Sequence, residues 1–551
     1  MNFLEKISNK TTKISYTAAR FYLLVLSGLL TGLTLVFTEI GFVEWITLVP
    51  VAAVVLIRAS DTEVKLRSLY LDGLVFFYSF FLTCFHWFVY LYPLDFVDGM
   101  TKGGALAVIL VAWLGLSLLQ AALSGFAFVL IGLVFRSRIC IRFPLLKVFS
   151  AAGIWAIAEW SQTIGWWGVP WGRLPIGQTE YLWGLQNASI LGSYFVTFML
   201  VSVNFLLAMA LINPPKIKLG VLCATVLILF QYGSGAILWY LKDVSQGEKI
   251  KVACIQGNIS SAEKWDSSSI TKTLTNYQRL TEDAANQGAE LVIWPETAFP
   301  YDIGEGGYSA YSDYFASLSN KYDIYIMVGA YVSDEDDNLL NSLICFTPDG
   351  EVLDDVYSKR HLVPFGEYVP LKKFIQTFIP PLAELVLSEG EIYAGEGSQI
   401  IELDNGIKTG GLICFDSIYE QLTLESVRDG AELICLATND SWFIDSKALY
   451  MHNAQAQIRA IESGRYIARA ANTGISTIIN SRGEVISELE PLVDGFVINE
   501  VYANDQKTFW SIIGNLPIFI FVLGEAYILI DEIVFKIKRK KMSNVDFDEN
   551  L

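Results

Sequence analysis

The sequence of 551 residues is 53% hydrophobic, with a formal net charge of −18 and a mean hydropathy of +0.42. So acidic a chain lacks the basic face that a nucleic acid requires, which excludes that class of partner. Seven cysteines and three histidines show no CxxC pair and no metal-ligand spacing. We therefore expect no disulfide framework, no metal site and no cofactor.

Long apolar segments dominate residues 20–242 and return at 509–535. A helix needs roughly 20 apolar residues to cross about 30 Å of hydrocarbon. On this basis eight spans are predicted, at 20–38, 41–57, 68–92, 104–134, 146–162, 183–212, 217–241 and 509–535. The sequence thus predicts an N-terminal membrane domain of about seven helices (1–242), a water-soluble domain (243–505) and a final helix with a basic tail (506–551).

The connections between these spans alternate in charge. Lys and Arg gather in every second one, at 1–20, 58–67, 135–147, 213–218 and 536–541, whereas the others hold only Lys102 and Arg173. The positive-inside rule then places both termini in the cytoplasm and residues 243–508 on the opposite side of the membrane. One outer connection contains the Trp- and Gly-rich run 165–172, which is either an interfacial aromatic belt or a platform for lipid entry.

The soluble region alternates apolar runs with polar helical stretches. Strands are predicted at Ile250–Ile255, Leu291–Trp294, Ile324–Gly329, Ser342–Phe346, Thr409–Ile413, Leu433–Ala437 and Ser476–Ile479. Helices are predicted at Ser268–Gln287, Gly307–Ser319, Ser417–Arg428 and Tyr450–Ser463. Asp349-Gly350 and Arg482-Gly483 are typical of hairpin turns. The fold class is therefore a multi-span α-helical membrane bundle plus an α/β sandwich with helices outside.

Cys414 directly follows the predicted strand 409–413, at the end where open α/β sheets place their chemistry. A single buried cysteine is more often part of a core than a nucleophile. However, Glu296 and Lys359 also follow apolar runs. Glu296 could remove the thiol proton, and Lys359 could stabilise the oxyanion that forms when sulfur attacks a carbonyl.

Each residue also has an ordinary structural interpretation. Glu296 could be the acid at a helix N-terminus, and Lys359 could be a solvated surface lysine. Glu367 could brace its proline-edged loop. No Cys–His pair is evident, because His361 and His452 have no clear third member.

The order of Glu296 in WPET, Lys359 in YSKRHLVPFGEYVP and Cys414 in GLICFDS resembles the Glu–Lys–Cys signature of the nitrilase superfamily. Longer strings resemble the apolipoprotein N-acyltransferase family, as does the order of membrane and soluble parts over essentially the whole chain. These strings are VACIQGNI (252–259), KW (264–265), VIWPETAFP (292–300), KRHLVPFGEYVP (359–370), ATNDSWF (437–443) and ANTGIS (471–476).

The resemblance implies a nitrilase-like αββα sandwich and a role for each matching residue. Cys414 would be the nucleophile, Glu296 the general base and Lys359 the oxyanion stabiliser. A second active-site acid would orient Lys359 or the base, and two tryptophans would lie near the substrate: Glu367, Trp265 and Trp442.

The chain departs from the family pattern at two places. Phe415 and Asp416 stand where the family has Tyr-Glu, so a hydroxyl is lost and the supporting carboxylate is one methylene shorter. Ile444 stands where a glycine often follows the Trp-Phe pair, so we expect that loop to differ in shape.

The implied reaction passes an acyl chain from a membrane phospholipid through a thioester at Cys414. The acceptor is the N-terminal α-amine of diacylglyceryl-cysteine on an apolipoprotein. We expect a monomer in the bacterial inner membrane with the catalytic domain on the periplasmic side. The alternatives are a membrane-tethered hydrolase of carbon–nitrogen bonds, and a transporter or sensor with a degenerate nitrilase-like domain. An intact Glu, Lys and Cys set disfavours the latter.

Overall fold

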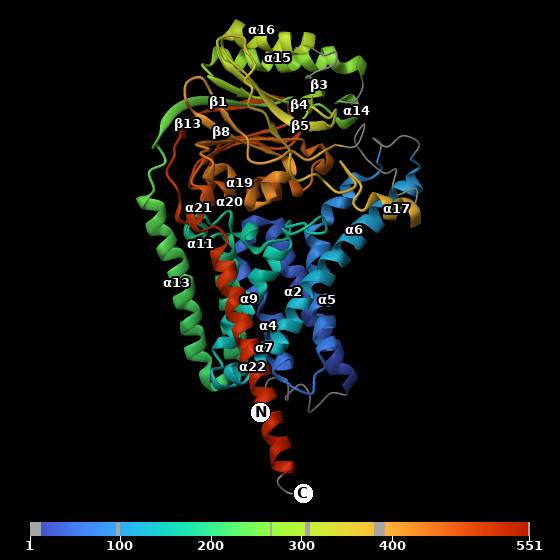
Figure 1. The fold of residues 1–551 in the computed structure, drawn as a ribbon, viewed down its shortest axis with the longest axis vertical. Coiled ribbons are helices and arrows are strands. Elements are labelled where there is room, and N and C mark those ends of the chain that lie inside the picture. Colours follow the sequence, from blue (N-terminus) through green and yellow to red (C-terminus); the bar gives the residue numbers. More distant parts are fainter. Residues whose placement is uncertain (1–12, 95–99, 265–266, 304–308, 379–391, 549–551) are drawn as a thin grey trace. The chain divides into compact units, whose positions relative to one another are not determined.

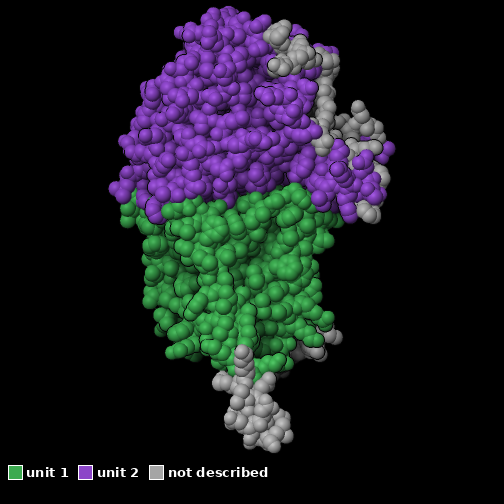
Figure 2. Space-filling view, viewed as in Figure 1, with its two compact units in different colours: residues 1–86, 113–237, 513–551 green, residues 87–112, 238–512 purple. Residues whose placement is uncertain are grey.

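The computed structural model describes residues 13–94, 100–264, 267–303, 309–378 and 392–548. The chain divides into two compact units, which Figure 2 colours separately. The first comprises residues 1–86, 113–237 and 513–551, and the second comprises residues 87–112 and 238–512.

The first unit is a bundle of helices (Figure 1). Among the described residues, five stretches are long and apolar enough to cross a membrane: Thr17–Val36, Thr38–Ser60, Lys102–Phe135, Ser193–Ile212 and Pro214–Leu241. The helices in them are α2 (Lys13–Val36), α3 (Glu44–Thr47), α4 (Val49–Ser60), α6 (Lys102–Ser124), α7 (Phe126–Phe135), α12 (Ser193–Ile212) and α13 (Ile217–Leu241). The shorter pieces of the first unit are η1 (Thr38–Val43), α8 (Arg138–Arg142), η3 (Leu174–Gln178), α10 (Leu182–Leu185), α11 (Ala188–Leu191) and η4 (Pro214–Lys216). Two further short pieces, η2 (His86–Leu91) and α21 (Phe509–Ile513), lie almost wholly in the second unit, as does the first part of α6.

These five stretches match five of the eight predicted spans. The other three coincide with α5 (Leu66–Cys84), α9 (Leu146–Ser161) and α22 (Leu516–Asp548), which fall short as spans by length or composition. The α9 helix has only 16 residues, α5 carries Arg67 and Asp72, and α22 carries several acids. Crossing by these three helices therefore stays a prediction.

The acids within the bundle are turned toward protein, as expected for groups that are costly in hydrocarbon. Glu159 is 3% exposed and accepts hydrogen bonds from the Thr197 hydroxyl (2.6 Å) and the Leu174 amide (3.1 Å). Glu44 is fully buried and accepts a hydrogen bond from Gln178 (2.7 Å). The Leu174 and Gln178 contacts tie the 163–182 connection to α9 and to α3.

The second unit contains two β-sheets, which are flanked by helices. The first sheet has the strand order β13-β1-β2-β4-β5-β6, with β3 paired to β4; the second has the order β12-β11-β10-β9-β8-β7. The strands of the first are β1 (Glu248–Gln256), β2 (Leu291–Ile293), β3 (Phe299–Asp302), β4 (Tyr325–Ser333), β5 (Leu339–Phe346), β6 (Tyr357–Ser358) and β13 (Gly495–Ala503). Those of the second are β7 (Ile400–Glu402), β8 (Lys408–Ile413), β9 (Leu433–Thr438), β10 (Tyr466–Ala471), β11 (Ser476–Ile479) and β12 (Val485–Leu489).

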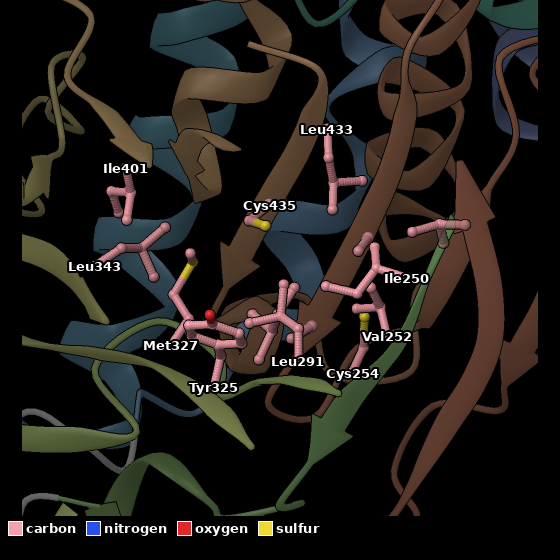
Figure 3. Packing of buried hydrophobic residues seen from close by; sticks show 14 of the residues in the cluster. Ile250, Val252, Cys254, Leu291, Tyr325, Met327, Leu343, Ile401, Leu433 and Cys435 are labelled. Atoms are coloured by element: carbon pink, nitrogen blue, oxygen red, sulfur yellow. The ribbon is translucent and has the colours of Figure 1, made fainter. Parts of the chain in front are cut away.

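Side-chain alternation along the strands builds two cores. On β1, Ile250, Val252 and Cys254 point between the sheets, where they join residues such as Leu433 and Cys435 of the other sheet (Figure 3). Ala253 and Ile255 point the other way, into a second core shared with α15 (Ile270–Asn286) and α16 (Ser309–Tyr322). Burial on both faces explains why these strands are almost continuously apolar.

Helices cover the outer faces, which gives the predicted αββα sandwich. In Figure 1, α15 and α16 lie over the first sheet, and α19 (Glu420–Arg428) and α20 (Ala448–Ser463) cover the second. Short pieces complete the unit: α14 (Ser261–Lys264), η5 (Ser267–Ser269), α17 (Lys372–Phe378), η6 (Cys414–Ile418) and η7 (Asp440–Phe443). The two predicted turns are confirmed, because Gly350 and Gly483 follow strands with φ of +80° and +82° and each precedes an antiparallel return.

Candidate active site

Cys414 lies at the carboxyl end of β8, as the sequence predicts, and begins the short helix η6. Its φ is +47°, a conformation that costs a non-glycine residue about 1–3 kcal/mol and persists only where the surroundings hold it. The neighbouring β6 comes very close, since a Cβ at Gly411 would lie 2.3 Å from Tyr357 Cγ. Glycine is thus required beside the nucleophile candidate.

Glu296 follows β2 and is 5% exposed. Its Oε1 accepts hydrogen bonds from Lys359 Nζ (2.9 Å) and Asn341 Nδ2 (2.8 Å), and its Oε2 accepts one from the Asn439 amide (2.8 Å). Asn341 is on β5 and Asn439 directly follows β9, so both sheets fix the orientation of this carboxylate.

Lys359 is 1% exposed and lies between two carboxylates. Its ammonium group donates to Glu296 and, at 2.8 Å, to Oε1 of Glu367. The other oxygen of Glu367 accepts a hydrogen bond from the Val363 amide (2.8 Å), which closes the loop between the two residues. The interpretation of Lys359 as a solvated surface lysine is therefore wrong.

The electrostatics favour a neutral thiol beside a charged acid and a charged amine. Burial raises the pKa of the Cys414 thiol, the Glu296 carboxylate raises it further, and Lys359 opposes both. Burial disfavours the charged form of Glu296, but Lys359 and Lys264 outweigh it and hold the pKa of that carboxyl below its usual value. Although burial disfavours its charge too, Glu296 and Glu367 raise the pKa of Lys359 well above its ordinary value. A Cys414 that acts as a nucleophile would therefore have to lose its proton during the attack.

Asp416 is fully buried and joins the Cys414 turn to the Lys359 segment. Its Oδ2 accepts from the Tyr357 hydroxyl (2.9 Å) and the Ile413 amide (3.1 Å). Its Oδ1 accepts from the amides of His361 (2.8 Å) and Arg360 (3.3 Å). The shorter carboxylate thus reaches four donors around Lys359, which fits a positioning role.

We expect Asp416→Ala to impair the enzyme, because four donors lose their acceptor and the Lys359 segment loses its anchor. Each buried donor left unsatisfied costs about 1–3 kcal/mol. Thermal unfolding and acyl-transfer rates should both report the loss. Phe415→Tyr is the matched control, since Phe415 is half-buried with its ring 5.4 Å from that of Tyr419, and it should retain activity. Wild-type behaviour of Asp416→Ala would show that the carboxylate does not position Lys359.

His452 has partners that the sequence did not reveal, so the expectation that it lacks a third member is wrong. Its Nδ1 is 2.9 Å from Asp440 Oδ1, and its Nε2 is 3.0 Å from Ser417 Oγ and 3.2 Å from the Cys414 carbonyl oxygen. Asp440 is also paired with Arg469 (2.6 Å). The Ser417 hydroxyl is fully buried and donates to the Cys414 carbonyl (2.8 Å), so this array supports the turn at Cys414 rather than forming a serine triad.

His361 is not placed to serve as a base. Its ring lies 3.9 Å from that of Tyr419. Burial and the neighbouring Arg360 lower its pKa to about 4. The His361 side chain is therefore uncharged at neutral pH. Its backbone amide donates a hydrogen bond to Asp416.

Of the two predicted substrate tryptophans, Trp442 is among the described residues. Trp265 lies outside the described residues. Trp442 is half-buried in η7, next to Phe443, whose ring packs 4.9 Å from that of Trp87. Ile444 ends this turn with φ of +48°, a conformation that glycine adopts without strain. A contact between Trp442 and substrate remains a prediction.

Several residues of the site were missed from the sequence. Asn341, Asn439 and Lys264 all bind the Glu296 segment, the last through a hydrogen bond to its backbone oxygen (2.9 Å). Two of them stand inside strings that the sequence analysis singled out, KW and ATNDSWF. That was the only available signal, because their partners lie 32 to 143 residues away in the chain.

Each of the two units matches a known protein family. Residues 251–507 match the family model for carbon-nitrogen hydrolases, and residues 27–206 match that for the apolipoprotein N-acyltransferase N-terminal domain. The apolipoprotein N-acyltransferase of Gloeobacter violaceus is 30% identical over 83% of this chain and 83% of its own length. That of Geobacter metallireducens is 33% identical over 70% of this chain and 73% of its own.

Among solved structures, Saccharomyces cerevisiae Nit3, a member of branch 10 of the nitrilase superfamily, covers 50% of this chain and 97% of its own. It is 21% identical, with a TM-score of 0.36. By the family model that it matches, the second unit is of the carbon-nitrogen hydrolase class, and the chain also carries helices long and apolar enough to cross a membrane. The chain belongs to the apolipoprotein N-acyltransferase family, and it is an acyltransferase of lipoprotein maturation.

Proposed function

We propose that this enzyme moves an acyl chain from a membrane phospholipid to the α-amine of an N-terminal diacylglyceryl-cysteine, through a thioester at Cys414. The observation that carries the proposal is the ion-paired array of the buried Glu296 and Lys359 with the partly buried Glu367, together with the action of the first two charges on Cys414. Such an array can take a proton and stabilise a developing oxyanion.

In the first half of the reaction, the Cys414 sulfur attacks the ester carbonyl while Glu296 takes the thiol proton. The carbonyl electrons move to oxygen, where the Lys359 ammonium stabilises the negative charge. Collapse breaks the bond to the glycerol oxygen, which takes the proton from Glu296. A lysophospholipid leaves, and the acyl group stays on sulfur.

In the second half, the α-amine of the acceptor attacks the thioester carbonyl. Glu296 takes a proton from the attacking amine, and the C–S bond breaks as the amide forms. The departing sulfur takes this proton from Glu296, which returns the site to its starting state. The same base and oxyanion stabiliser thus serve both halves.

The membrane helices fit this chemistry because both substrates are anchored in the bilayer. Pulling an acyl chain into water costs about 0.8 kcal/mol per CH₂. A catalytic domain held by spans of the same chain avoids that cost. Small water-soluble amides or nitriles would need no such anchoring.

A chain-labelled phospholipid separates transfer from hydrolysis. The purified enzyme, in phospholipid vesicles, is given a phospholipid with a labelled acyl chain and a diacylglyceryl-cysteine peptide. We expect the label on the peptide α-amine, with a peptide acetylated at that amine as the control that stays unlabelled. Release of the label as free fatty acid at the same rate with and without peptide would indicate a hydrolase.

The catalytic domain is expected on the outer side of the membrane, with both termini in the cytoplasm. A reporter that is active only outside the cytoplasm should work when fused after Asp243 and fail when fused after Lys541. The reverse pattern would overturn this orientation. The eight spans predicted from the sequence require the two fusions to differ, because an odd number of spans separates them.

A further inference from the structure

Lys264 is a second buried lysine at the site, and the Glu–Lys–Cys chemistry assigns it no role. It ends α14 and is 6% exposed. Its Nζ donates to the backbone oxygen of Glu296 (2.9 Å). Its charge also acts on the Glu296 carboxylate and on the Cys414 thiol. A buried ammonium group is costly unless it offsets negative charge.

The charges around the general base show what Lys264 offsets. Lys359 divides its ammonium between Glu296 and Glu367. Buried Asp416 adds a further acid whose charge acts on Lys359, and Asp440 acts on the thiol while paired with Arg469. Glu296, Glu367 and Asp416 together exceed the two lysines by one negative charge. Without the charge of Lys264 the excess rises to two, at the place where a further oxyanion must form.

We propose that Lys264 is a positioning residue for the general base, which holds the Glu296 backbone in place and keeps its carboxylate ionised. This inference rests on the proposed function, because it assigns Lys264 to the proton transfer from Cys414. Lys264 acts through Glu296, whereas Lys359 stabilises the oxyanion itself.

The sign of the pH effect follows from the contacts. The positive charge of Lys264 lowers the pKa of Glu296, together with Lys359 and the hydrogen bond from Asn341. Removing that charge should therefore shift the acid side of the rate profile to higher pH. Burial lowers the pKa of Lys264 itself to about 8, with Lys359 adding to this and Glu296 and Cys414 opposing it. The wild type should accordingly lose rate as the pH rises through about 8.

The test uses the first half-reaction, so that titration of the acceptor amine does not enter. Full-length enzyme in vesicles is mixed with phospholipid alone, and thioester formation at Cys414 is followed by rapid quench from about pH 3 to about pH 9. We expect Lys264→Met to move the acid side up by about one pH unit or more, with about tenfold slower acylation at the acid end of this range. Lys264→Arg should keep the wild-type acid side and lose the decline near pH 8.

Lys272→Met is the matched control, because Lys272 pairs with Glu263 on the surface (2.8 Å) and should leave the profile unchanged. If Lys264→Met does not fold, Lys264→Arg still decides the matter, since retention of the decline near pH 8 would overturn the inference. An unshifted acid side in folded Lys264→Met would also overturn it while leaving the thioester mechanism intact. Absence of any thioester in the wild type would overturn both.

Discussion

Replacing Cys414 with alanine should abolish acyl transfer. The substitution removes the atom that carries the acyl group, so the rate should fall by about 10⁴-fold or more, as for other nucleophiles. Cys414→Ser should be nearly as inactive, because the buried Glu296 would have to take a proton from a much weaker acid. Transfer of labelled acyl chain to a diacylglyceryl peptide, per folded enzyme, is the measurement.

A second cysteine supplies the control for Cys414. Cys435 is on β9, the strand next to β8, with its thiol buried between the two sheets. Cys435→Ala removes a thiol from the same sheet without touching the site, so it should keep acyl transfer. Activity in Cys414→Ala comparable to that of Cys435→Ala would exclude a cysteine nucleophile at position 414.

Replacing Glu296 with glutamine should produce the next largest loss. Glutamine keeps the shape of the side chain but cannot accept the thiol proton, and a positioned base contributes about 10²–10⁴ in rate. The loss should appear in acylation of Cys414 and in transfer to the amine, because Glu296 acts in both halves. Acylation and transfer rates of the same preparation test this directly.

Glu290→Gln is the matched substitution for Glu296→Gln. Glu290 directly precedes β2, is exposed and accepts a hydrogen bond from the Lys251 amide (2.9 Å), so its loss should leave both rates nearly unchanged. Thioester formation in Glu296→Gln within about tenfold of wild type would mean that another group takes the proton, since this is below the usual share of a general base.

Local pattern was enough to predict most of the sandwich. Runs such as 250–255 and 409–413 are apolar because both faces of those strands are buried, and this signal needs no partner information. The strand β10 is among those that were missed, because Arg465 directly precedes it and Arg469 interrupts its hydrophobic pattern. Both arginines are buried, and Arg469 is paired with Asp440, so only the tertiary structure explains them.

In the first unit, hydropathy located the apolar segments but did not predict where their helices break. The stretch predicted as one span at 183–212 is broken into α10, α11 and α12, with Gly192 at φ of +77° before the last of them. The stretch at 41–57 is likewise divided between η1, α3 and α4. Hydropathy reports how apolar a segment is, but breaks of this kind depend on packing and on single residues.

The residue types of the site could be predicted from the sequence, but the orientation of their side chains could not. The order of Glu296, Lys359 and Cys414 pointed to acyl chemistry, while their orientation depends on Asn341 and Asn439, which come from the two different sheets. The contacts of the shorter Asp416 carboxylate could not be predicted, because its four donors belong to segments that pattern alone cannot place together.

Mass spectrometry of the Cys414 peptide, after incubation of the wild-type enzyme with phospholipid and no acceptor, tests the thioester most directly. The proposed mechanism predicts one acyl group on Cys414, labile to hydroxylamine and lost when a diacylglyceryl-cysteine peptide is added. An unmodified Cys414 in enzyme that still acylates the peptide, or an acyl group on another side chain such as Ser417, would contradict it.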